Sequence, residues 1–478
     1  MIVKVRHTPT ARFGVAAAMT ALGFAFSLAV FYPGVMTYDS GYVHDALATG
    51  NLGDWQSPVM TVLWAAIDPI APGPASMFLL IAALYWLGFF VLVAALSRRS
   101  SWPALVVPLL GLAPPAFCLM GIIWRDVLFA ALWLNAAALG LAVARSEGGG
   151  RIAAQAVALA LVTLGLLLRP NALFAAPILG AAIAWPRRFS GRRMALLYLP
   201  AAALLFGLTR IVFYDVIGAR EQHPIQSIMV FDLGGISHFT GDNQFPGTWT
   251  PAESSEIALS CYQPTEWDIY WWRLPCSFVM KRLEAEKIFG TPALSEAWRR
   301  VVLAHPLAYL QHRAAFMANF LFGANLTMWT EDTSDHTKTV YRDRPLFMAL
   351  KGLHDALKET PLFRVGAWLL LDGALVLLAW RRRGTPEGTF AVGTCLSAVV
   401  YVLSFAAIGV ADDFRYAYWA VLAGLAGGVV TLTPSSRRKP LGGTKFPLAA
   451  GETKFRREPG SIVPTPWRLK DGFRLSSE

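Results

Sequence analysis

The sequence has 478 residues, of which 55% are hydrophobic and only 15% are charged, whereas soluble globular proteins have about 25% charged residues. Long stretches without any Asp, Glu, Lys or Arg cover 13–38, 69–97, 100–124, 388–411 and 416–436, which excludes an ordinary soluble core. The net charge of +11 is concentrated in the C-terminal tail and in arginine clusters beside apolar runs, which favours contact with lipid headgroups over nucleic-acid binding.

The apolar segments predict an all-α polytopic membrane protein with about ten transmembrane helices and a mixed, mainly helical outer domain. A crossing helix needs about 20 apolar residues, and the basic N-terminus is followed by an apolar run too long for a cleaved signal peptide. Two of the predicted spans, 153–168 and 171–186, are near the lower length limit. The predicted spans are 12–32, 76–97, 102–123, 127–144, 153–168, 171–186, 194–214, 362–380, 389–410 and 415–433.

Basic clusters in the short loops set the predicted topology, because cytoplasmic loops carry the excess of Lys and Arg. The sequence predicts a multi-pass protein of the cell inner membrane with both termini cytoplasmic. The apolar segment 314–330 is predicted to be an interfacial helix or part of the outer domain, since a crossing there would move Arg381–Arg383 outside. The predicted inner loops contain Arg98-Arg99, Arg145 with Arg151, Arg187–Arg193 and Arg381–Arg383; the predicted outer loops are 33–75, 124–126, 169–171, 215–361 and 411–414.

Four parts of the chain follow from this topology. An N-terminal transmembrane module, 1–214, carries the predicted catalytic first outer loop, 33–75. An outer domain, 215–361, contains short predicted helices near 277–289 and 293–304, and its Cys261 and Cys276 can pair if the domain lies outside. C-terminal transmembrane helices occupy 362–433, and a basic cytoplasmic tail, 434–478, is predicted to be disordered.

The first outer loop contains the leading catalytic candidate, Asp39, about six residues after the predicted membrane exit at Pro33. One interpretation is that Asp39 or Ser40 caps a short helix, 41–49, that ends at Gly50. The other is that Asp39 is a carboxylate base that removes the proton of an acceptor hydroxyl. Further along, an apolar segment after Pro58 is too short to cross and is predicted to lie along the membrane surface.

Charged residues in the other outer turns extend this prediction. Asp126 is the second catalytic candidate, although it can instead form a local pair with Arg125. Arg169 is either a snorkelling residue or a phosphate clamp, and Arg415 has the same two interpretations. Asp372 lies inside an apolar run, where structural pairing, with Arg210 as one partner, is favoured over catalysis. We predict Asp39 and Asp126 as catalytic residues, and as substrate-binding residues Arg125, Arg169, Arg415, Tyr38, Asp45 and Trp55.

Several segments in order along the chain resemble the glycosyltransferase C superfamily, including protein mannosyltransferase-like and lipid A aminoarabinose transferase-like enzymes of bacteria. They are YPGVMTYDSGY and DWQSPVMTVLW in the first loop, IIWRDVLFAALWL, RPNALFAAP, HPLAYLQHR and DDFRYAYW, spread over 32–419. The resemblance implies a transferase that takes a sugar from a polyprenyl-phosphate carrier on the outer leaflet, with Asp39 as base or stabiliser and Asp126 as the second-turn acidic residue. Some family members have a DE or DD pair where this sequence has Asp39-Ser40, so a two-carboxylate arrangement within the first loop does not carry over. Some members use a divalent cation and others do not, and the sequence does not decide between a divalent cation and no cofactor.

The resemblance and the residues together favour inverting transfer, in which Asp39 deprotonates the acceptor while Arg169, Arg125 or Arg415 holds the leaving phosphate. The expected partners are a polyprenyl-phosphate sugar donor, a lipid, polysaccharide or protein acceptor, and membrane lipids, without nucleic acid. Two alternatives remain open at this stage. One is a lipid or glycolipid transporter or flippase, and the other is a glycolipid-binding envelope assembly protein without turnover.

Overall fold

The computed structural model describes residues 9–97, 101–323, 326–334 and 338–433. Over these ranges the chain is helical, and its extended segments form only isolated β-bridges. The predicted all-α membrane fold is confirmed. The predicted disordered tail, 434–478, and the Arg98-Arg99 cluster lie outside the described residues.

Six of the described helices are long and apolar enough to cross a membrane. A seventh span results if α5 (Ser101–Leu110) and α6 (Pro114–Met120), which are bent by 51° relative to each other, are counted together. The six are α1 (Pro9–Phe31), α4 (Pro74–Ser97), α7 (Arg125–Val143), α8 (Gly149–Leu168), α10 (Gly191–Arg210, continued by the π-helical η3, Ile211–Val216) and α18 (Pro386–Ile408).

The remaining predicted spans form shorter or broken helices. The span predicted at 102–123 is interrupted between α5 and α6, where Pro114 and Pro115 follow, because proline lacks the N–H that a continuous helix needs. The span predicted at 171–186 is a 3₁₀ turn, η2 (Pro170–Phe174), followed by α9 (Ala176–Ala184). Nine residues of helix rise only about 14 Å, so α9 alone does not cross. The predicted spans 362–380 and 415–433 correspond to α17 (Val365–Trp380) and α19 (Tyr418–Leu432).

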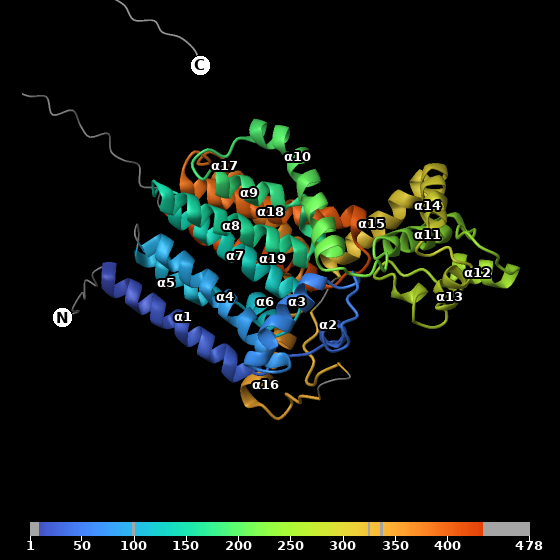
Figure 1. Cartoon of the computed structure of the whole chain (residues 1–478), viewed down its shortest axis with the longest axis horizontal. Helices are drawn as coiled ribbons and strands as arrows, with labels where there is room; N and C mark the ends of the chain where they lie inside the picture. The colour runs from blue at the N-terminus through green and yellow to red at the C-terminus, as the bar shows by residue number, and fades with distance from the viewer. Residues whose placement is uncertain (1–8, 98–100, 324–325, 335–337, 434–478) are drawn as a thin grey trace, which may run out of the picture. The chain divides into compact units, whose positions relative to one another are not determined.

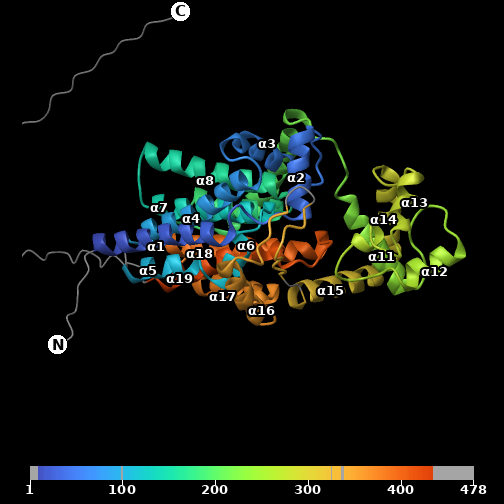
Figure 2. The same cartoon turned by 90° about the horizontal axis from the view of Figure 1, so that it is seen from below.

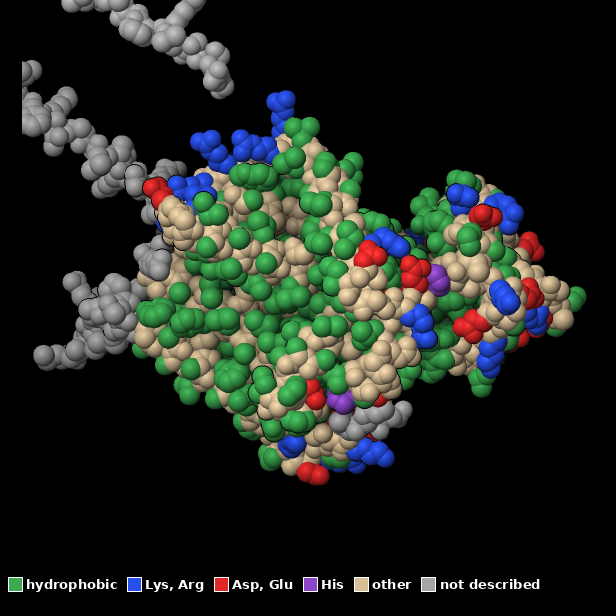
Figure 3. Space-filling model, viewed as in Figure 1, with side chains coloured by type: hydrophobic (Ala, Val, Ile, Leu, Met, Phe, Trp, Pro, Cys, Tyr) green, Lys and Arg blue, Asp and Glu red, His purple; other side chains and the backbone are tan. Residues whose placement is uncertain are grey.

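The long helices pack side by side (Figures 1 and 2). α4 packs against α1, α5 and α7, while α7 also contacts α8 and α19, and α18 packs against α17, α19 and α9. In the apolar window of α7 83% of the residues are buried, against 6% in that of α10. α7 is therefore the central helix, and α10 presents its apolar side chains outward, as a lipid-facing helix does. Figure 3 shows hydrophobic side chains over this face of the bundle, with charged side chains gathered over α11–α14.

The loops predicted to lie inside meet one another at one end of the helices. Arg145, after α7, pairs with Glu387 at the start of α18, with 3.1 Å between Nη2 and Oε1. Arg187, after α9, donates a hydrogen bond to the carbonyl of Ala144. The loops with the predicted cytoplasmic arginines are thus on a common side of the bundle.

The segment predicted to be the outer domain is built from α11 (Gln226–Thr240), α12 (Pro251–Leu259), α13 (Phe278–Ala285) and α14 (Pro292–Ala304), together with α15 (Pro306–Phe322) and α16 (Pro345–Leu357). The helices predicted near 277–289 and 293–304 correspond to α13 and α14. Cys261 and Cys276 form a disulfide. α15 packs on α11 and on α17 and α18, and its Arg313 donates to the carbonyl of Gly409, 2.7 Å away, at the end of α18.

The first outer loop folds into two short helices, α2 (Tyr38–Thr49) and α3 (Pro58–Ile67), followed by the turn η1 (Asp68–Ile70). α2 begins earlier than predicted, and its N-cap is Thr37 rather than Asp39 or Ser40. The Ser40 hydroxyl accepts a hydrogen bond from the Thr37 backbone N–H, as in a capping box. Gly50 ends the helix as predicted, with a positive φ of 67° that suits glycine.

Candidate functional site

A short backbone bridge brings the first outer loop beside the start of α7. The N–H of Val35 donates to the Gly121 carbonyl at 2.9 Å, and the N–H of Ile123 donates to the Val35 carbonyl at 3.0 Å. The Ser40 hydroxyl adds a buried hydrogen bond of 2.6 Å to the Ile123 carbonyl. The first turn of α2 is therefore fixed next to the outer turn that contains Arg125 and Asp126.

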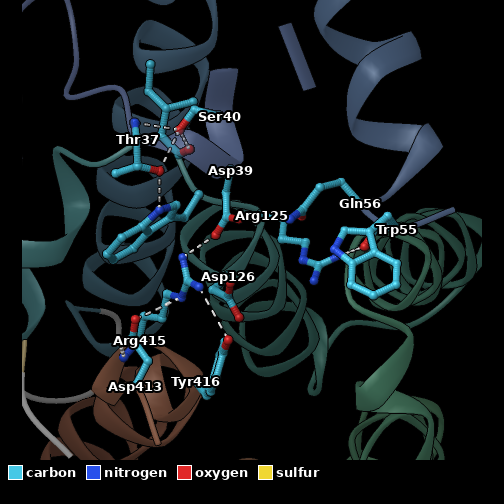
Figure 4. A network of polar contacts seen from close by, with 12 residues as sticks. Thr37, Asp39, Ser40, Trp55, Gln56, Arg125, Asp126, Asp413, Arg415 and Tyr416 are labelled. Atoms are coloured by element: carbon cyan, nitrogen blue, oxygen red, sulfur yellow. Dashed lines mark hydrogen bonds and ion pairs between the residues drawn. The ribbon is translucent and has the colours of Figure 1, made fainter. Parts of the chain in front are cut away.

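Asp39 lies in that first turn, and its carboxylate points away from the cap. The Thr37 side chain is held on the other side by the indole N–H of Trp124, at 2.9 Å. The Asp39 carboxylate accepts a hydrogen bond of 3.1 Å from the Gln56 side chain through Oδ1 and lies 2.5 Å from Nη1 of Arg415 through Oδ2 (Figure 4). A third of the Asp39 side chain, 33%, is exposed, so Asp39 remains accessible to a ligand.

Arg415 is positioned by the turn η6 (Phe414–Ala417) and by two carboxylates. Its Nε lies 3.1 Å from Oδ2 of Asp413, whose other oxygen accepts from the Arg415 backbone N–H. The guanidinium lies 4.6 Å from the centre of the Trp124 ring and 5.1 Å from that of Tyr416, as in cation–π contacts. Arg415 is therefore a fixed cation beside Asp39, although 376 residues separate the two.

The electrostatics keep Asp39 ionised. Burial raises the pKa of this carboxyl, but the charges of nearby arginines, Arg415 first and then Arg125, outweigh burial and hold the pKa below its ordinary value. An opposite charge at hydrogen-bond distance favours the charged form of a carboxyl group. Asp39 is thus a carboxylate at neutral pH.

A second ion pair lies beside the first. Asp126, at the start of α7, lies 3.0 Å from Nε of Arg169, and both residues are only 4% exposed. The Arg169 guanidinium is also 4.6 Å from the Tyr416 ring centre and within 3.4 Å of the Tyr401 hydroxyl. The alternative that Asp126 pairs locally with Arg125 is therefore not what the structure contains.

Arg125 differs from the other two arginines. Its Nη1 donates a 3.4 Å hydrogen bond to the Trp55 carbonyl, and within the described ranges it forms no ion pair with a carboxylate. It is the first residue of α7, where the helix dipole places additional positive potential. Figure 4 shows Arg125 between Asp39 and Trp55. Asp126 and Asp39 are close enough to act on Arg125 electrostatically, but neither forms an ion pair with it. A guanidinium at a helix N-terminus favours binding of an anion.

These groups line one cavity of about 1270 Å³. Its wall comes from all the segments predicted to be outer loops, and it includes seven of the eight predicted site residues. Asp45 is the exception: it follows Asp39 by six residues, which places it on another face of α2 because a helix has 3.6 residues per turn. The seven are Tyr38, Asp39, Trp55, Arg125, Asp126, Arg169 and Arg415.

Other residues of the wall were not predicted from the sequence as site residues. Gln56 binds Asp39, and Gln222 accepts from the Trp55 backbone N–H at 3.0 Å. Gln222 is in turn bound by Asp54. Neutral polar residues in loops have no charge or periodicity signal, so only the three-dimensional contacts identify them.

An apolar side of the cavity is formed by η2 and the end of α10. Phe174 is 39% exposed and Phe206 is 54% exposed. With them, Leu173, Thr209 and Phe213 line the same wall. The poorly covered helix α10 thus contributes part of an apolar wall to the cavity.

The predicted pairing of Asp372 is resolved by the structure. Asp372 is fully buried in α17, but Arg210 pairs with Glu221 at 3.1 Å, so the suggested Arg210–Asp372 pair is wrong. No group of three or more His, Cys, Asp or Glu side chains that could hold a metal ion is present in the part of the chain that the structure describes.

No protein-family model matches the sequence, and no curated protein matches it significantly. Solved structures of an oligosaccharyltransferase of Archaeoglobus fulgidus match the chain at low TM-score and low identity. The complex with Zn and sulfate has a TM-score of 0.37 at 13% identity, covering 86% of this chain and 48% of that chain. The complex of that archaeal enzyme, AglB, with an inhibitory peptide and a dolichol-phosphate has a TM-score of 0.37 at 11% identity, covering 87% and 50%. The chain spans about half of the length of these structures.

Proposed function

We propose that this protein is a membrane glycosyltransferase that transfers a sugar from a polyprenyl-phosphate-linked donor to an acceptor at the outer face of the cell inner membrane. The observation that carries the proposal is that one cavity contains both an ionised, accessible carboxylate and an arginine that forms no ion pair with a carboxylate among the described residues. Asp39 is that carboxylate, and Arg125 is that arginine.

The donor phosphate would bind at Arg125. A guanidinium matches phosphate oxygens with two parallel hydrogen bonds, and the N-terminus of α7 adds backbone N–H groups and positive potential. Arg169 and Arg415 are near enough to influence Asp39 electrostatically, so the phosphate would meet a field of three arginines. The apolar wall beside Phe174 and Phe206 would receive the first isoprene units of the carrier.

Asp39 would act as the base. The acceptor hydroxyl gives its proton to the Asp39 carboxylate while its oxygen forms a bond to the anomeric carbon of the donor. The bond from that carbon to the phosphate oxygen breaks, and the phosphate leaves with the electron pair, stabilised by the arginines. Asp126 is buried against Arg169, so we assign it a positioning role.

The Asp39–Arg415 pair suggests how donor binding would activate the base. In the structure Arg415 neutralises Asp39, which makes the carboxylate a weak base. A bound phosphate would compete for Arg415 and reduce its interaction with Asp39, because one guanidinium shares its charge among its anions. The basicity of Asp39 would then rise only when the donor is present.

The domain organisation and orientation belong to the same proposal. We place the segments that form the cavity on the outer side, with the module 1–214, the outer domain 215–361 and the helices 362–433 as its parts. The disulfide between Cys261 and Cys276 supports this side, because disulfides persist in oxidising compartments. The arginine-bearing loops at the other end of the bundle would then be cytoplasmic, together with both termini.

The test is transfer by the purified full chain in lipid nanodiscs, measured as release of polyprenyl phosphate from donors that carry hexoses or pentoses. Asp39→Asn keeps the shape and an acceptor for Gln56 but removes the base, so transfer should fall by about 10²- to 10⁴-fold. Asp45→Asn is the matched control, since it lies on the same helix outside the cavity wall. Unchanged transfer in Asp39→Asn would reject the assignment, and donor movement across the bilayer without product would support a flippase.

A further inference from the structure

Three tryptophans form a continuous aromatic surface on the cavity wall. The ring centres of Trp55 and Trp271 are 5.0 Å apart, those of Trp55 and Trp267 are 5.6 Å apart, and those of Trp267 and Trp271 are 5.3 Å apart. The last two rings are nearly parallel, with an angle of 16° between their planes. All three residues line the cavity. We call this set the tryptophan wall.

The tryptophan wall is held by the backbone on two sides. The backbone N–H of Trp55 donates to the Gln222 side chain, and the backbone carbonyl of Trp55 accepts a hydrogen bond from Arg125. The N–H of Trp267 donates to the carbonyl of Val410 at 2.9 Å. Val410 leads into the turn that contains Arg415, so the wall and Arg415 are parts of the same local structure.

Carboxyl groups accompany the aromatic rings. Asp268 and Asp412 both line the cavity, and neither forms an ion pair within the described ranges of the chain. Burial, together with the charge of Glu266 on both and that of Asp413 on Asp412, raises the pKa of each to about 6. Glu266 is bound by Arg273. This side of the cavity therefore has aromatic faces and acidic hydrogen-bonding groups, whereas the side near Arg125 is cationic.

This combination selects one class of ligand. An indole face is a large apolar surface that a pyranose ring can cover with its C–H face, and carboxyl groups accept or donate hydrogen bonds to the ring hydroxyls. A phosphate is repelled by the same carboxylates and attracted by the arginines. The side of the cavity near Arg125 therefore suits a phosphate, and the side with the tryptophans and carboxyl groups suits a saccharide.

We propose that the tryptophan wall is the acceptor subsite and that the acceptor is a saccharide. The proposal rests on the proposed function, because it uses Asp39 to divide the cavity between donor and acceptor. The acceptor sugar would stack on Trp55 and Trp271 and direct a hydroxyl toward Asp39. The acceptor is then a glycan or glycolipid headgroup, not an extended peptide.

The test is saturation-transfer-difference NMR on the full chain in nanodiscs, with mannotriose, maltotriose and chitotriose as saccharide probes and an uncharged Ser/Thr/Gly decapeptide as the competing class. At least one saccharide should receive saturation at its C–H protons, and Trp271→Ala should reduce that signal at least fivefold. Trp271→Phe, which keeps an aromatic face, should retain most of it. Trp249→Ala is the control, because Trp249 is a partly buried tryptophan of the outer segment outside the cavity wall.

Donor and acceptor sites are distinguished by adding undecaprenyl phosphate or its glycosylated form. An acceptor subsite keeps the saccharide signal with both, whereas loss of the signal only with the glycosylated carrier would identify a donor-sugar site and overturn the proposal. Binding of the decapeptide but of no saccharide, or of nothing at all, would overturn it as well. These outcomes do not depend on turnover, so they are separate from a failure of the Asp39→Asn transfer assay.

Discussion

Asp39 is subject to two opposing effects at the scale of a single residue. Burial disfavours its charge, and the neighbouring arginines, Arg415 first, favour it, with the net result that its pKa is lowered. A group whose pKa is lowered stays ionised until the pH falls through that lowered value. Since a base must be deprotonated to act, the acidic limit of kcat/KM, which reports the free protein, should lie below the ordinary aspartate pKa of about 3.9.

Removal of the arginine should shift that limit. In Arg415→Gln the largest favourable charge is lost while burial remains, so the pKa of Asp39 should rise and the acidic limb of the pH–rate profile should move to higher pH. The measurement is residual transfer as a function of pH in wild type and variant, with Arg342→Gln as control because Arg342 is an exposed arginine paired with Glu331. A limb that stays in place would show that Arg415 does not control Asp39.

The sequence singles out individual charged residues where a charge lies beside an apolar run, and the structure brings these residues to one cavity; their roles remain predictions. Asp39, Arg125, Arg169 and Arg415 each follow or precede a long uncharged segment, and burial of charge there is costly enough to mark them. Their partners were not predictable, because the Arg169–Asp126 and Arg415–Asp39 pairs depend on how distant segments meet. Asp45 shows the reverse error, since nearness in sequence to Asp39 does not place it on the same helix face.

At the scale of elements, α2 depends on its cap. Thr37→Ala removes the hydroxyl that binds Trp124 and Ser40, and leaving a buried donor such as the Trp124 indole N–H without its partner costs about 1–3 kcal/mol. We expect a lower melting temperature and a reduced kcat, because Asp39 lies in the first turn of that helix. Thermal unfolding and transfer measured side by side check this.

Thr37→Ser is the matched variant, since it keeps the hydroxyl. It should restore both the melting temperature and kcat. If Thr37→Ala leaves kcat and stability at wild-type values, the cap does not position the catalytic carboxylate.

Element prediction succeeded for long apolar helices and failed at proline and at short segments. α4, α7 and α18 correspond to predicted spans because their apolar runs are uninterrupted. Apolar composition does not reveal that residues 102–123 bend or that residues 171–186 contain only the short helix α9. Those breaks depend on backbone hydrogen bonds that proline removes and on packing against α18.

At the scale of the whole molecule, the loops that line the cavity and the loops that contain the predicted cytoplasmic arginines lie at opposite ends of the bundle. A cysteine placed at Ser255, in the outer segment, should react with a membrane-impermeant maleimide in intact cells. A cysteine at Ser146, in the loop after α7, should react only after permeabilisation. The native free cysteines, Cys118 and Cys395, are buried and give a low background. Equal labelling of both positions in intact cells would contradict the proposed orientation.

The assembly of the cavity was only partly predictable. Loop charges indicated which segments share a side, and that side is where the cavity forms. The order of loops around the cavity, the bridge between Val35 and Ile122 and the tryptophan wall arise from long-range packing. A single sequence contains no local signal for such contacts.

The central claim is that the carrier phosphate binds at Arg125 beside Asp39. Its most direct test is the affinity of the purified chain for undecaprenyl phosphate in nanodiscs, compared between wild type, Arg125→Gln and the exposed control Arg342→Gln. Hydrogen bonds to charged groups contribute about 1.5–3 kcal/mol, so Arg125→Gln should bind about 10- to 150-fold more weakly while the control binds like wild type. Equal affinity of Arg125→Gln and wild type would contradict the account.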